Sequence, residues 1–539
     1  MVALSHLILM PIIIPLATVV ATLLLGSDRS REMNIGLNLF SAVVQVAFAA
    51  ILVAQFANTA APGHVLSYPL GNWPIPFGIV LVADRTAALM VLTTAILGLA
   101  AMTYATARWH KAGPSFFPLF QTLLMGLNGA YLTGDLFNLF VFFEVLLAAS
   151  YGLALHSGGS ARVRAALHYI AVNLVASFLF LIGAAIIYGT TGTLNMADLA
   201  RVIPSIAAED RGLFEAGAAI LGVAFLIKAG MWPLSFWLPP TYSAAAPPIA
   251  AVFVVMTKVG VYVILRLSLL LFGSEAGTSA GFGHDVLFAG GIVTIAFASF
   301  GALAAQSTGR MASYLVLVSS GTLLAATGYQ QQGVTAGALL YLVSSTFATG
   351  ALFLLADLID RIRIAGADVL AVTMEIYGED GEAIDEEEEE EGIMIPATTT
   401  LLGISFAVAA VLLAGLPPFA GFLAKFGMLA SALAPGVDTK AWWITGALVL
   451  SGLGILIAMA RSGINIFWAT VIEAPAAVRL AEILPILVLL ALCISMTAFA
   501  GPLIGYLDQA ADLLHNPAGY VSAVLETPLV TMAGAEGTP

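Results

Sequence analysis

Charged residues and cysteine are both scarce in this chain of 539 residues. Only 9% of the residues are Asp, Glu, Lys or Arg, whereas 60% are hydrophobic. Such a chain cannot form a water-soluble globule, so the composition indicates a polytopic membrane protein. The single cysteine, Cys493, can form no intrachain disulfide and excludes any cysteine-based metal or redox centre. We expect no cofactor, no metal site and no nucleic-acid partner.

Long apolar runs predict an all-α fold with fourteen membrane-spanning helices. The first run, from Leu4 to Leu25, is too long for a signal-peptide core and has no basic region in front of it, so we expect it to be retained. The spans centre near Pro15, Val44, Leu92, Leu124, Leu146, Ser177, Val223, Lys258, Ile295, Ser320, Ser345, Ser405, Leu450 and Leu490.

The basic residues predict the orientation of these helices, because Lys and Arg concentrate in cytoplasmic loops. With the N-terminus outside, only Arg201, Arg211 and Lys440 fall in outer loops. Both termini are therefore expected outside. The basic residues that then fall inside are Arg29, Arg31, Arg108, Lys111, Arg162, Arg164, Arg310, Arg361, Arg363, Arg461 and Arg479.

Proline and glycine interrupt the seventh and twelfth spans. Pro233 lies in the first interruption, and Pro417 and Pro418 lie in the second. Proline removes a backbone donor and clashes with the preceding turn, so both helices should break. Broken backbone at membrane depth persists only where protein or a wet cavity satisfies it. Each break is the fourth span in a group of five, which predicts two inverted repeats, helices 4–8 and 9–13, as in secondary transporters.

These features divide the chain into four parts, one of which contains a strongly acidic segment. Eleven acidic residues lie between Glu375 and Glu391, which accounts for most of the net charge of -13. Like charges repel and stay solvated, so we interpret the segment as a disordered surface loop, with a cation-collecting or partner-docking role as the alternative.

The expected parts are three N-terminal helices in 1–110, the first repeat in 111–273 with its broken helix around 228–240, the second repeat in 286–463 with an acidic cytoplasmic loop 361–395 and a broken helix around 415–425, and a C-terminal helix and tail in 481–539.

Four charged side chains lie within the apolar spans, namely Glu144, Lys228, Lys258 and Lys425. A charge at the bilayer centre costs about 2.5 to 3.5 kcal/mol, so charges retained there indicate a functional site. The structural alternatives are a buried structural carboxylate at Glu144 and capping of carbonyls freed at the breaks by Lys228 and Lys425.

Glutamate and lysine together can move protons. Burial favours the neutral form of lysine, and a nearby carboxylate favours the charged form. A pair of Glu144 and Lys228 would therefore hold a proton when closed and release it when open. A series from Lys228 through Lys258 to Lys425, bridged by water and small polar side chains, would pass charge between the two repeats.

Three further sites carry charged or titratable residues, but the sequence alone does not assign them to the proton path. Arg266, two turns beyond Lys258, either extends this series or snorkels to the membrane edge. The adjacent Asp84 and Arg85 suggest a charge pair at a helix end. His168 lies close to basic residues and is interpreted as interfacial.

Four segments of the chain resemble one known family. They are 133–144 (TGDLFNLFVFFE), 228–239 (KAGMWPLSFWLP), 257–262 (TKVGVY, followed by Arg266) and 415–425 (GLPPFAGFLAK). These segments are similar to the proton-channel subunits shared by respiratory complex I and Mrp-type cation/proton antiporters, and the similarity covers nearly the whole chain. Segments 73–85 (WPIPFGIVLVADR) and 319–325 (SSGTLLA) resemble the D subunit of the Mrp-type (Pha or Mnh) complex most closely.

The resemblance implies that the four buried charges belong to the family's proton path, in its fifth, seventh, eighth and twelfth helices. Two serines depart from the family pattern. Ser235 stands where relatives commonly have a histidine after the first break, and Ser344 takes the place of another histidine in the eleventh span. A hydroxyl can relay a proton through water but cannot hold one near neutral pH. Ordered water would therefore have to bridge Lys258 and Lys425.

The resemblance also implies a function. We expect a proton-translocating subunit of a multisubunit monovalent cation/proton antiporter in the bacterial inner membrane, and a transporter rather than an enzyme. The implied partners are a large A-type subunit, small hydrophobic subunits, protons, a monovalent cation expected to be Na+, and the lipid bilayer. One alternative is a proton-pumping subunit of a respiratory NADH:quinone oxidoreductase or membrane hydrogenase. Another is a membrane scaffold that conducts nothing.

Overall fold

The computed structural model describes residues 6–26, 31–59, 63–109, 115–377, 397–434, 438–467 and 478–528. For residues 362–377 it describes only the backbone. The acidic residues from 378 to 391 lie outside these ranges, and so do Arg29 and Lys111. For the acidic residue Glu375 and for Arg363 only the backbone is described.

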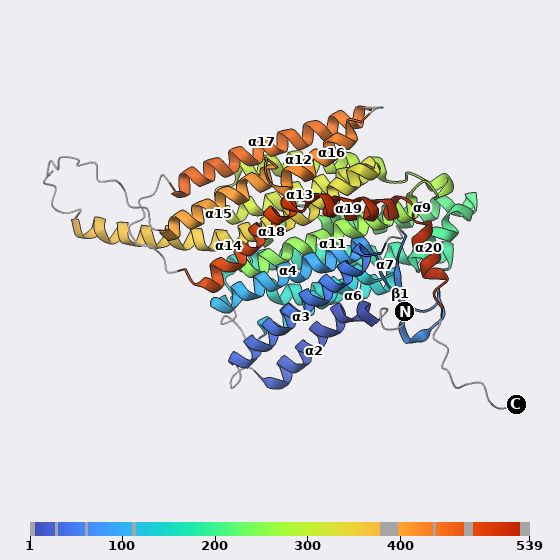
Figure 1. Cartoon of the computed structure of the whole chain (residues 1–539), viewed down its shortest axis with the longest axis horizontal. Coiled ribbons are helices and arrows are strands. Elements are labelled where there is room, and N and C mark those ends of the chain that lie inside the picture. The colour runs from blue at the N-terminus through green and yellow to red at the C-terminus, as the bar shows by residue number, and fades with distance from the viewer. Residues whose placement is uncertain are drawn as a thin grey trace.

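Long helices make up most of the fold, and they run side by side along the long axis of the molecule (Figure 1). The N-terminal part and the first predicted repeat contain α2 (Met10–Leu25), α3 (Arg31–Ala57), α4 (Arg85–Ala107), α5 (Phe116–Leu132), α6 (Leu136–Ala154), α7 (Ser160–Thr191), α8 (Met196–Val202), α9 (Ala208–Ala229), α10 (Leu238–Ala244) and α11 (Pro247–Phe272). The second predicted repeat and the C-terminal part contain α12 (His284–Ala304), α13 (Thr308–Tyr329), α14 (Gln332–Tyr377), α15 (Ala397–Ala414), α16 (Ala420–Ala432), α17 (Thr439–Phe467), α18 (Leu480–Ala498), α19 (Ala500–His515) and α20 (Ala518–Leu525).

Within the described ranges, thirteen helices are long and apolar enough to cross a membrane. They coincide with thirteen of the predicted spans, which confirms an all-α, multi-pass membrane protein. The remaining predicted span, near Leu124, is α5, whose 17 residues extend over about 26 Å. That is slightly less than a hydrocarbon core of about 30 Å. The count of fourteen and the placement of the termini outside stay predictions.

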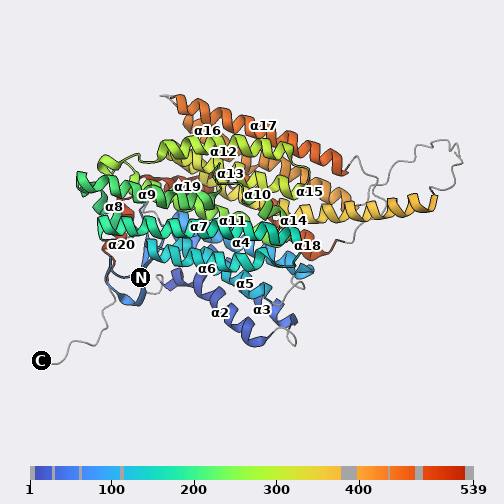
Figure 2. The same ribbon diagram turned by 180° about the vertical axis from the view of Figure 1, so that it is seen from behind.

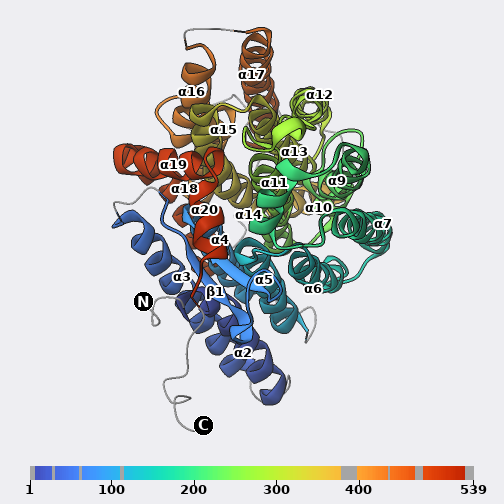
Figure 3. The same cartoon turned by 90° about the vertical axis from the view of Figure 1, so that its right-hand side faces the viewer.

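Two helices form the centre of the bundle. The apolar stretches of α11 and α14 are buried along their whole length, and α13 is nearly so. Viewed end-on, α11 and α14 lie in the middle, with α2 and α3 at one edge and α16 and α17 at the other (Figure 3). Figure 2 shows α6 and α7 on the face turned away from the viewer in Figure 1. A charged side chain on α11 is therefore remote from lipid.

Both predicted breaks are present. α9 ends at Ala229, and Gly230 follows with φ +72°, before a turn that leads to α10. α15 ends at Ala414, and Gly415 follows with φ +77°, before α16. Glycine adopts this left-handed conformation without steric cost, which makes it a common residue just after a helix. The peptide bonds before Pro233 and before Pro418 are cis.

α14 is longer than its apolar core. Its 46 residues extend to Tyr377, and its end projects beyond the neighbouring helices in Figure 1. The connection expected to begin at residue 361 is therefore helical through Tyr377. Residues 361–377 contain no proline, and the single glycine there, Gly366, costs a helix only about 1 kcal/mol, so the sequence allows the helix to continue.

A small hairpin covers one end of the bundle. β1 (Leu66–Pro69) pairs antiparallel with β2 (Val80–Ala83), with Leu66 opposite Ala83. β2 leads directly into α4, and α20 packs against β1. The hairpin therefore fixes where α4 begins, and with it the position of Asp84.

Candidate functional site

Lys228 occupies the last turn of α9, immediately before the first break. Its side chain is 5% exposed, and its ammonium group has no hydrogen-bond partner in the part of the chain that the structure describes. The Nζ atom lies 5.1 Å from the centre of the Phe143 ring. The ring face attracts the positive charge, but none of the three N–H donors has an acceptor among the described residues. The ammonium is therefore available to a new partner.

Glu144 follows Phe143 on α6 and is half-buried. Its Oε1 atom accepts a hydrogen bond of 2.5 Å from the Ser177 hydroxyl of α7. The carboxylate lies within electrostatic reach of Lys228, but among the described residues no ion pair joins the two side chains. The predicted pair is thus adjacent but open, with the carboxylate held by Ser177.

The backbone at the first break is satisfied by side chains from several helices. A break leaves carbonyl and N–H groups without helical partners, and each must find another inside a membrane. The hydrogen bonds that do so run from the Ser320 hydroxyl to the Ala229 carbonyl, from the Trp237 indole N–H to the Ile227 carbonyl at 3.1 Å, and from the Trp232 backbone N–H to the Thr294 hydroxyl at 2.9 Å.

Lys258 lies in the middle of α11 and is fully buried. Its Nζ atom donates to the Ser319 hydroxyl of α13 at 2.5 Å, and that hydroxyl lies 2.8 Å from the hydroxyl of Ser345 on α14. A polar chain therefore crosses from α11 to α14. α11 also contacts α9 directly, because a Cβ atom at Gly260 would lie only 2.8 Å from the backbone nitrogen of Ala229.

Lys425 lies on α16, just after the second break, and is 5% exposed. Its Nζ atom donates to the carbonyl of Ala414, the last residue of α15, at 2.9 Å. Gly415 provides the space, since a Cβ there would lie 3.1 Å from the same Nζ atom. The capping interaction considered for both break lysines therefore occurs at Lys425 and not at Lys228.

Ser235 and Ser344, the two serines expected to stand in place of family histidines, are both buried but differently placed. The Ser235 hydroxyl has no hydrogen-bond partner within the described ranges. The Ser344 hydroxyl donates to the carbonyl of Tyr341 on its own helix at 3.3 Å. The hydroxyl that extends the chain from Lys258 belongs to Ser345 instead. Sequence reasoning missed it because one residue along a helix turns the side chain by about 100° to a different face.

Arg266 is buried in an ion pair. It is 7% exposed, and its guanidinium donates to both carboxylate oxygens of Asp84, at 2.8 and 2.7 Å, and to the Tyr262 hydroxyl at 3.0 Å. Arg266 therefore does not snorkel to the membrane edge, and its part in the lysine series stays a prediction. The expected pair of Asp84 with Arg85 is wrong, because consecutive residues do not face each other. Arg85 donates instead to backbone carbonyls at and just beyond the end of α3.

A second charged cluster, not anticipated from the sequence, joins three helices near the end of the α14 core. Arg361 on α14 pairs with Asp357 at 3.1 Å and with Glu482 of α18 at 2.9 Å. The Tyr104 hydroxyl of α4 donates to Asp357 at 2.6 Å. The cluster anchors α14 where it leaves the bundle.

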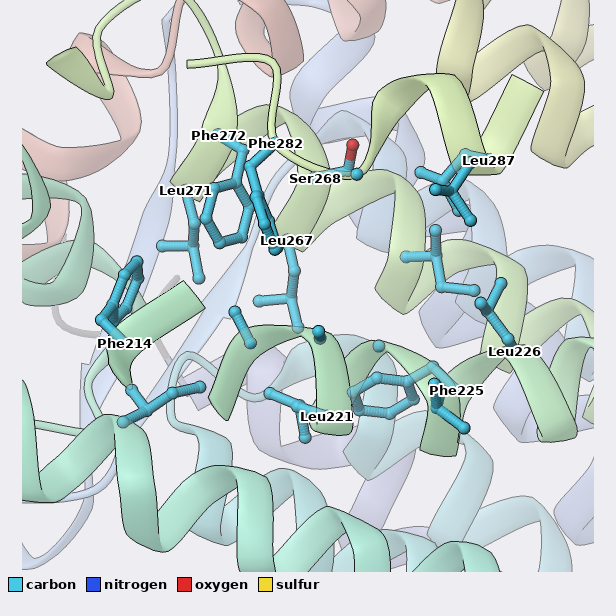
Figure 4. A pocket seen from close by; sticks show the side chains of 18 residues that line it. Phe214, Leu221, Phe225, Leu226, Leu267, Ser268, Leu271, Phe272, Phe282 and Leu287 are labelled. Carbon is cyan, nitrogen blue, oxygen red and sulfur yellow. The ribbon is translucent and has the colours of Figure 1, made fainter. Parts of the chain in front are cut away.

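An apolar pocket lies beside the first break, between α9, α11 and α12 (Figure 4). Phe225 and Leu226, which shortly precede Lys228, form part of its wall, and Ser268 is the polar residue labelled in the view. An apolar wall cannot replace the hydration of an ion. The pocket is therefore not part of an ion route.

Comparison with known proteins relates the whole chain to cation/proton antiporters. The family described as NADH:quinone oxidoreductase/Mrp antiporter, transmembrane, matches residues 133–454. Over 534 residues the chain is 54% identical to the D subunit of a probable K+/H+ antiporter of Rhizobium meliloti, covering 97% of this chain and 98% of that protein. It is 34% identical over 529 residues to the D subunit of the Na+/H+ antiporter of Alkalihalophilus pseudofirmus, covering 97% and 100%. A chain of the Mrp complex from Dietzia sp. superposes with a TM-score of 0.79 at 25% identity, covering 97% and 100%.

Proposed function

Because the chain belongs to the NADH:quinone oxidoreductase/Mrp antiporter transmembrane family, we propose that it is the D-type subunit of a multisubunit monovalent cation/proton antiporter and carries protons along its buried charges. The relatives named above support the assignment as a D-type subunit of a bacterial antiporter. We place the protein in the bacterial cell membrane, assembled with an A-type subunit and small hydrophobic subunits.

The bonding of Lys228 is the observation that carries the proposal. A structural lysine in a membrane interior would be expected to have its donors satisfied, whereas this ammonium has no hydrogen-bond partner in the described part of the chain and lies near a carboxylate. When the Glu144 carboxylate turns from Ser177 toward Lys228, the pair holds a proton. When it turns back, the lone ammonium is the least stable form of the site, and the proton leaves.

The next steps follow the polar chain across the central helices. Lys258 receives the proton and is linked through the Ser319 and Ser345 hydroxyls to α14. Ordered water completes the path from α14 to Lys425, whose ammonium rests on the carbonyl of Ala414. The two repeats are thereby coupled through their buried lysines.

The test uses the assembled complex in sealed membrane vesicles, where a pH-sensitive dye reports proton movement after addition of NaCl or KCl. Glu144→Gln and Lys228→Met are expected to assemble normally and to lose cation-dependent proton flux. Lys440→Met is the matched control, because Lys440 forms an exposed ion pair with Asp285 at 2.6 Å and lies outside the buried series. The ratio of NaCl to KCl responses identifies the cation.

Two outcomes would replace the proposal. If complexes with Glu144→Ala and Lys228→Ala retain full flux, the chain is a scaffold that conducts nothing. If the chain copurifies with iron–sulfur and flavin proteins instead of small hydrophobic subunits, it is a pumping subunit of a redox complex.

A further inference from the structure

A polar feature separate from the lysines runs through the contact of α2, α3 and α5. We name it the amide stripe: Thr18 on α2, Asn38, Ser41 and Gln45 on α3, and Gln121 and Asn128 on α5. Each of these side chains is at most 5% exposed. Their spacings of three, four or seven residues place them on one face of each helix. The opposite faces of α2 and α3 carry exposed Leu24 and Phe40, as expected against lipid.

Hydrogen bonds join the amide stripe into one network across three helices. The Thr18 hydroxyl donates to the Ser41 hydroxyl at 2.7 Å. The Gln45 amide nitrogen donates to the Ser41 hydroxyl at 3.2 Å and to the Gln121 side-chain oxygen at 3.0 Å. The Gln121 amide nitrogen in turn faces the carbonyl of Asn38 at 3.5 Å. Such bonds stabilise helix association in membranes, which is the simplest role for these residues.

Association does not account for all the buried amide oxygens of the stripe. Asn38 Oδ1, Gln45 Oε1 and Asn128 Oδ1 are buried and have no hydrogen-bond partner within the described ranges. Rotating the amides would not satisfy Asn38 Oδ1 or Asn128 Oδ1, because their nitrogens face the backbone carbonyls of Asn34 at 2.9 Å and Pro11 at 2.8 Å. Gln45 Oε1 would gain a donor only if the Gln45 and Gln121 amides both rotated. Buried acceptors are rarely left bare, so a missing ligand is indicated.

The chemistry of the amide stripe restricts that ligand. Its side chains are neutral amides and hydroxyls, so it cannot hold a proton near neutral pH, and its bare oxygens repel anions. Divalent cations such as Ca2+ and Mg2+ usually bind through one or more carboxylates, which the stripe lacks. Neutral oxygen atoms are the ligands that replace the water of monovalent cations in channels and transporters.

We propose that the amide stripe binds the antiported monovalent cation after it has lost part of its water, giving the cation a site separate from the lysine path. This inference rests on the proposed function, because it assigns the cation of the same exchange. The two ions are then bound by different chemistry in different helices, protons by Glu144 and the lysines and the cation by neutral oxygens.

The experiment measures the NaCl and KCl concentrations that give half-maximal proton flux in vesicles containing the assembled complex. Gln45→Leu and Gln121→Leu are each expected to raise this concentration about tenfold or more. Gln55→Leu is the matched control, since Gln55 lies on the same helix at the half-exposed end outside the stripe. Thr18→Val keeps the shape of the side chain and removes one hydroxyl, so it reports on the site even where a leucine variant fails to assemble; a rise of about threefold is expected.

The outcomes separate this inference from the function on which it rests. The inference is wrong if the half-maximal concentration is unchanged in all three variants, Gln45→Leu, Gln121→Leu and Thr18→Val, even where less complex assembles. The amide stripe would then serve helix packing or hold water. If Lys228→Met then still abolishes flux, the proposed function stands without it. If the unaltered complex shows no proton flux on addition of NaCl or KCl, the proposed function fails first.

Discussion

The hydroxyl of Ser319 is predicted to be essential for proton flux through Lys258. It is the acceptor for the Lys258 ammonium and also contacts the hydroxyl of Ser345, so it connects α11 with α14. Ser319→Ala removes this connection and adds no bulk. The charged form of Lys258 then loses the acceptor seen in the structure, in a site that is fully buried.

The size of the effect follows from the loss of one hydrogen bond to a charged group. Such a bond contributes about 1.5 to 3 kcal/mol. If the proton rests on Lys258 during transfer, the barrier rises by a similar amount, which slows flux by roughly 10- to 150-fold. Ser319→Thr keeps a hydroxyl and is expected to restore most of the flux.

The assay is the initial rate of cation-dependent proton movement in vesicles, normalised to the amount of assembled complex. Ser313→Ala is the matched control: Ser313 is buried on the same helix, but its hydroxyl donates to the carbonyl of Gly309 in its own helix. A Ser319→Ala complex that keeps more than half of the normal rate would refute the assignment of the proton route to this hydroxyl.

Other variants separate conduction from stability. Lys228→Met removes an ammonium that has no hydrogen-bond partner among the described residues, so thermal denaturation in detergent should show unchanged or higher stability although flux is lost. Lys425→Met removes the donor to the carbonyl that ends α15, so it should lose flux and also about 1.5 to 3 kcal/mol of stability. Arg266→Met leaves the Asp84 carboxylate buried and unpaired and should cost about 3 to 5 kcal/mol, whereas adding Asp84→Leu should recover part of the loss. Burial lowers the pKa of His156, so the folded state binds a proton there less readily than the unfolded state. The stability of the protein should therefore fall as the pH drops below about 6.5. In the same melting assay, His156→Gln should reduce that fall between pH 7.5 and 5.5.

Local chemistry made the helices and both breaks predictable from the sequence. Apolar length identified the spans, and the Pro and Gly residues around 230 and 415 marked where two of them end. The cost of charge in a bilayer singled out Lys228, Lys258 and Lys425, which the structure buries, and Glu144, which is half-buried. These inferences depend on neighbours along the chain, which the sequence contains.

Pairings between distant residues could not be predicted in this way. Asp84 finds Arg266, 182 positions away, and not its neighbour Arg85, because the pairing depends on how α4 and α11 pack. The role of Ser345 depends on a rotation of one residue along α14. The amide stripe was not predictable for another reason: neutral amides and hydroxyls are common between membrane helices, and only the packed arrangement shows which of their oxygens stay bare.

The side chains that bond to the backbone groups at the first break also restrict how far that backbone can move. Ser320, Trp237 and Thr294 hold its backbone groups from three different segments, so unwinding α9 further would break several hydrogen bonds at once. The side chains of Lys228 and Glu144 are not held by these bonds and can still rotate. Side-chain rotations are far faster than the microsecond to millisecond rearrangement of helices. Proton transfer at this break would then need only the rotation of side chains, while the backbone around Lys228 keeps its position.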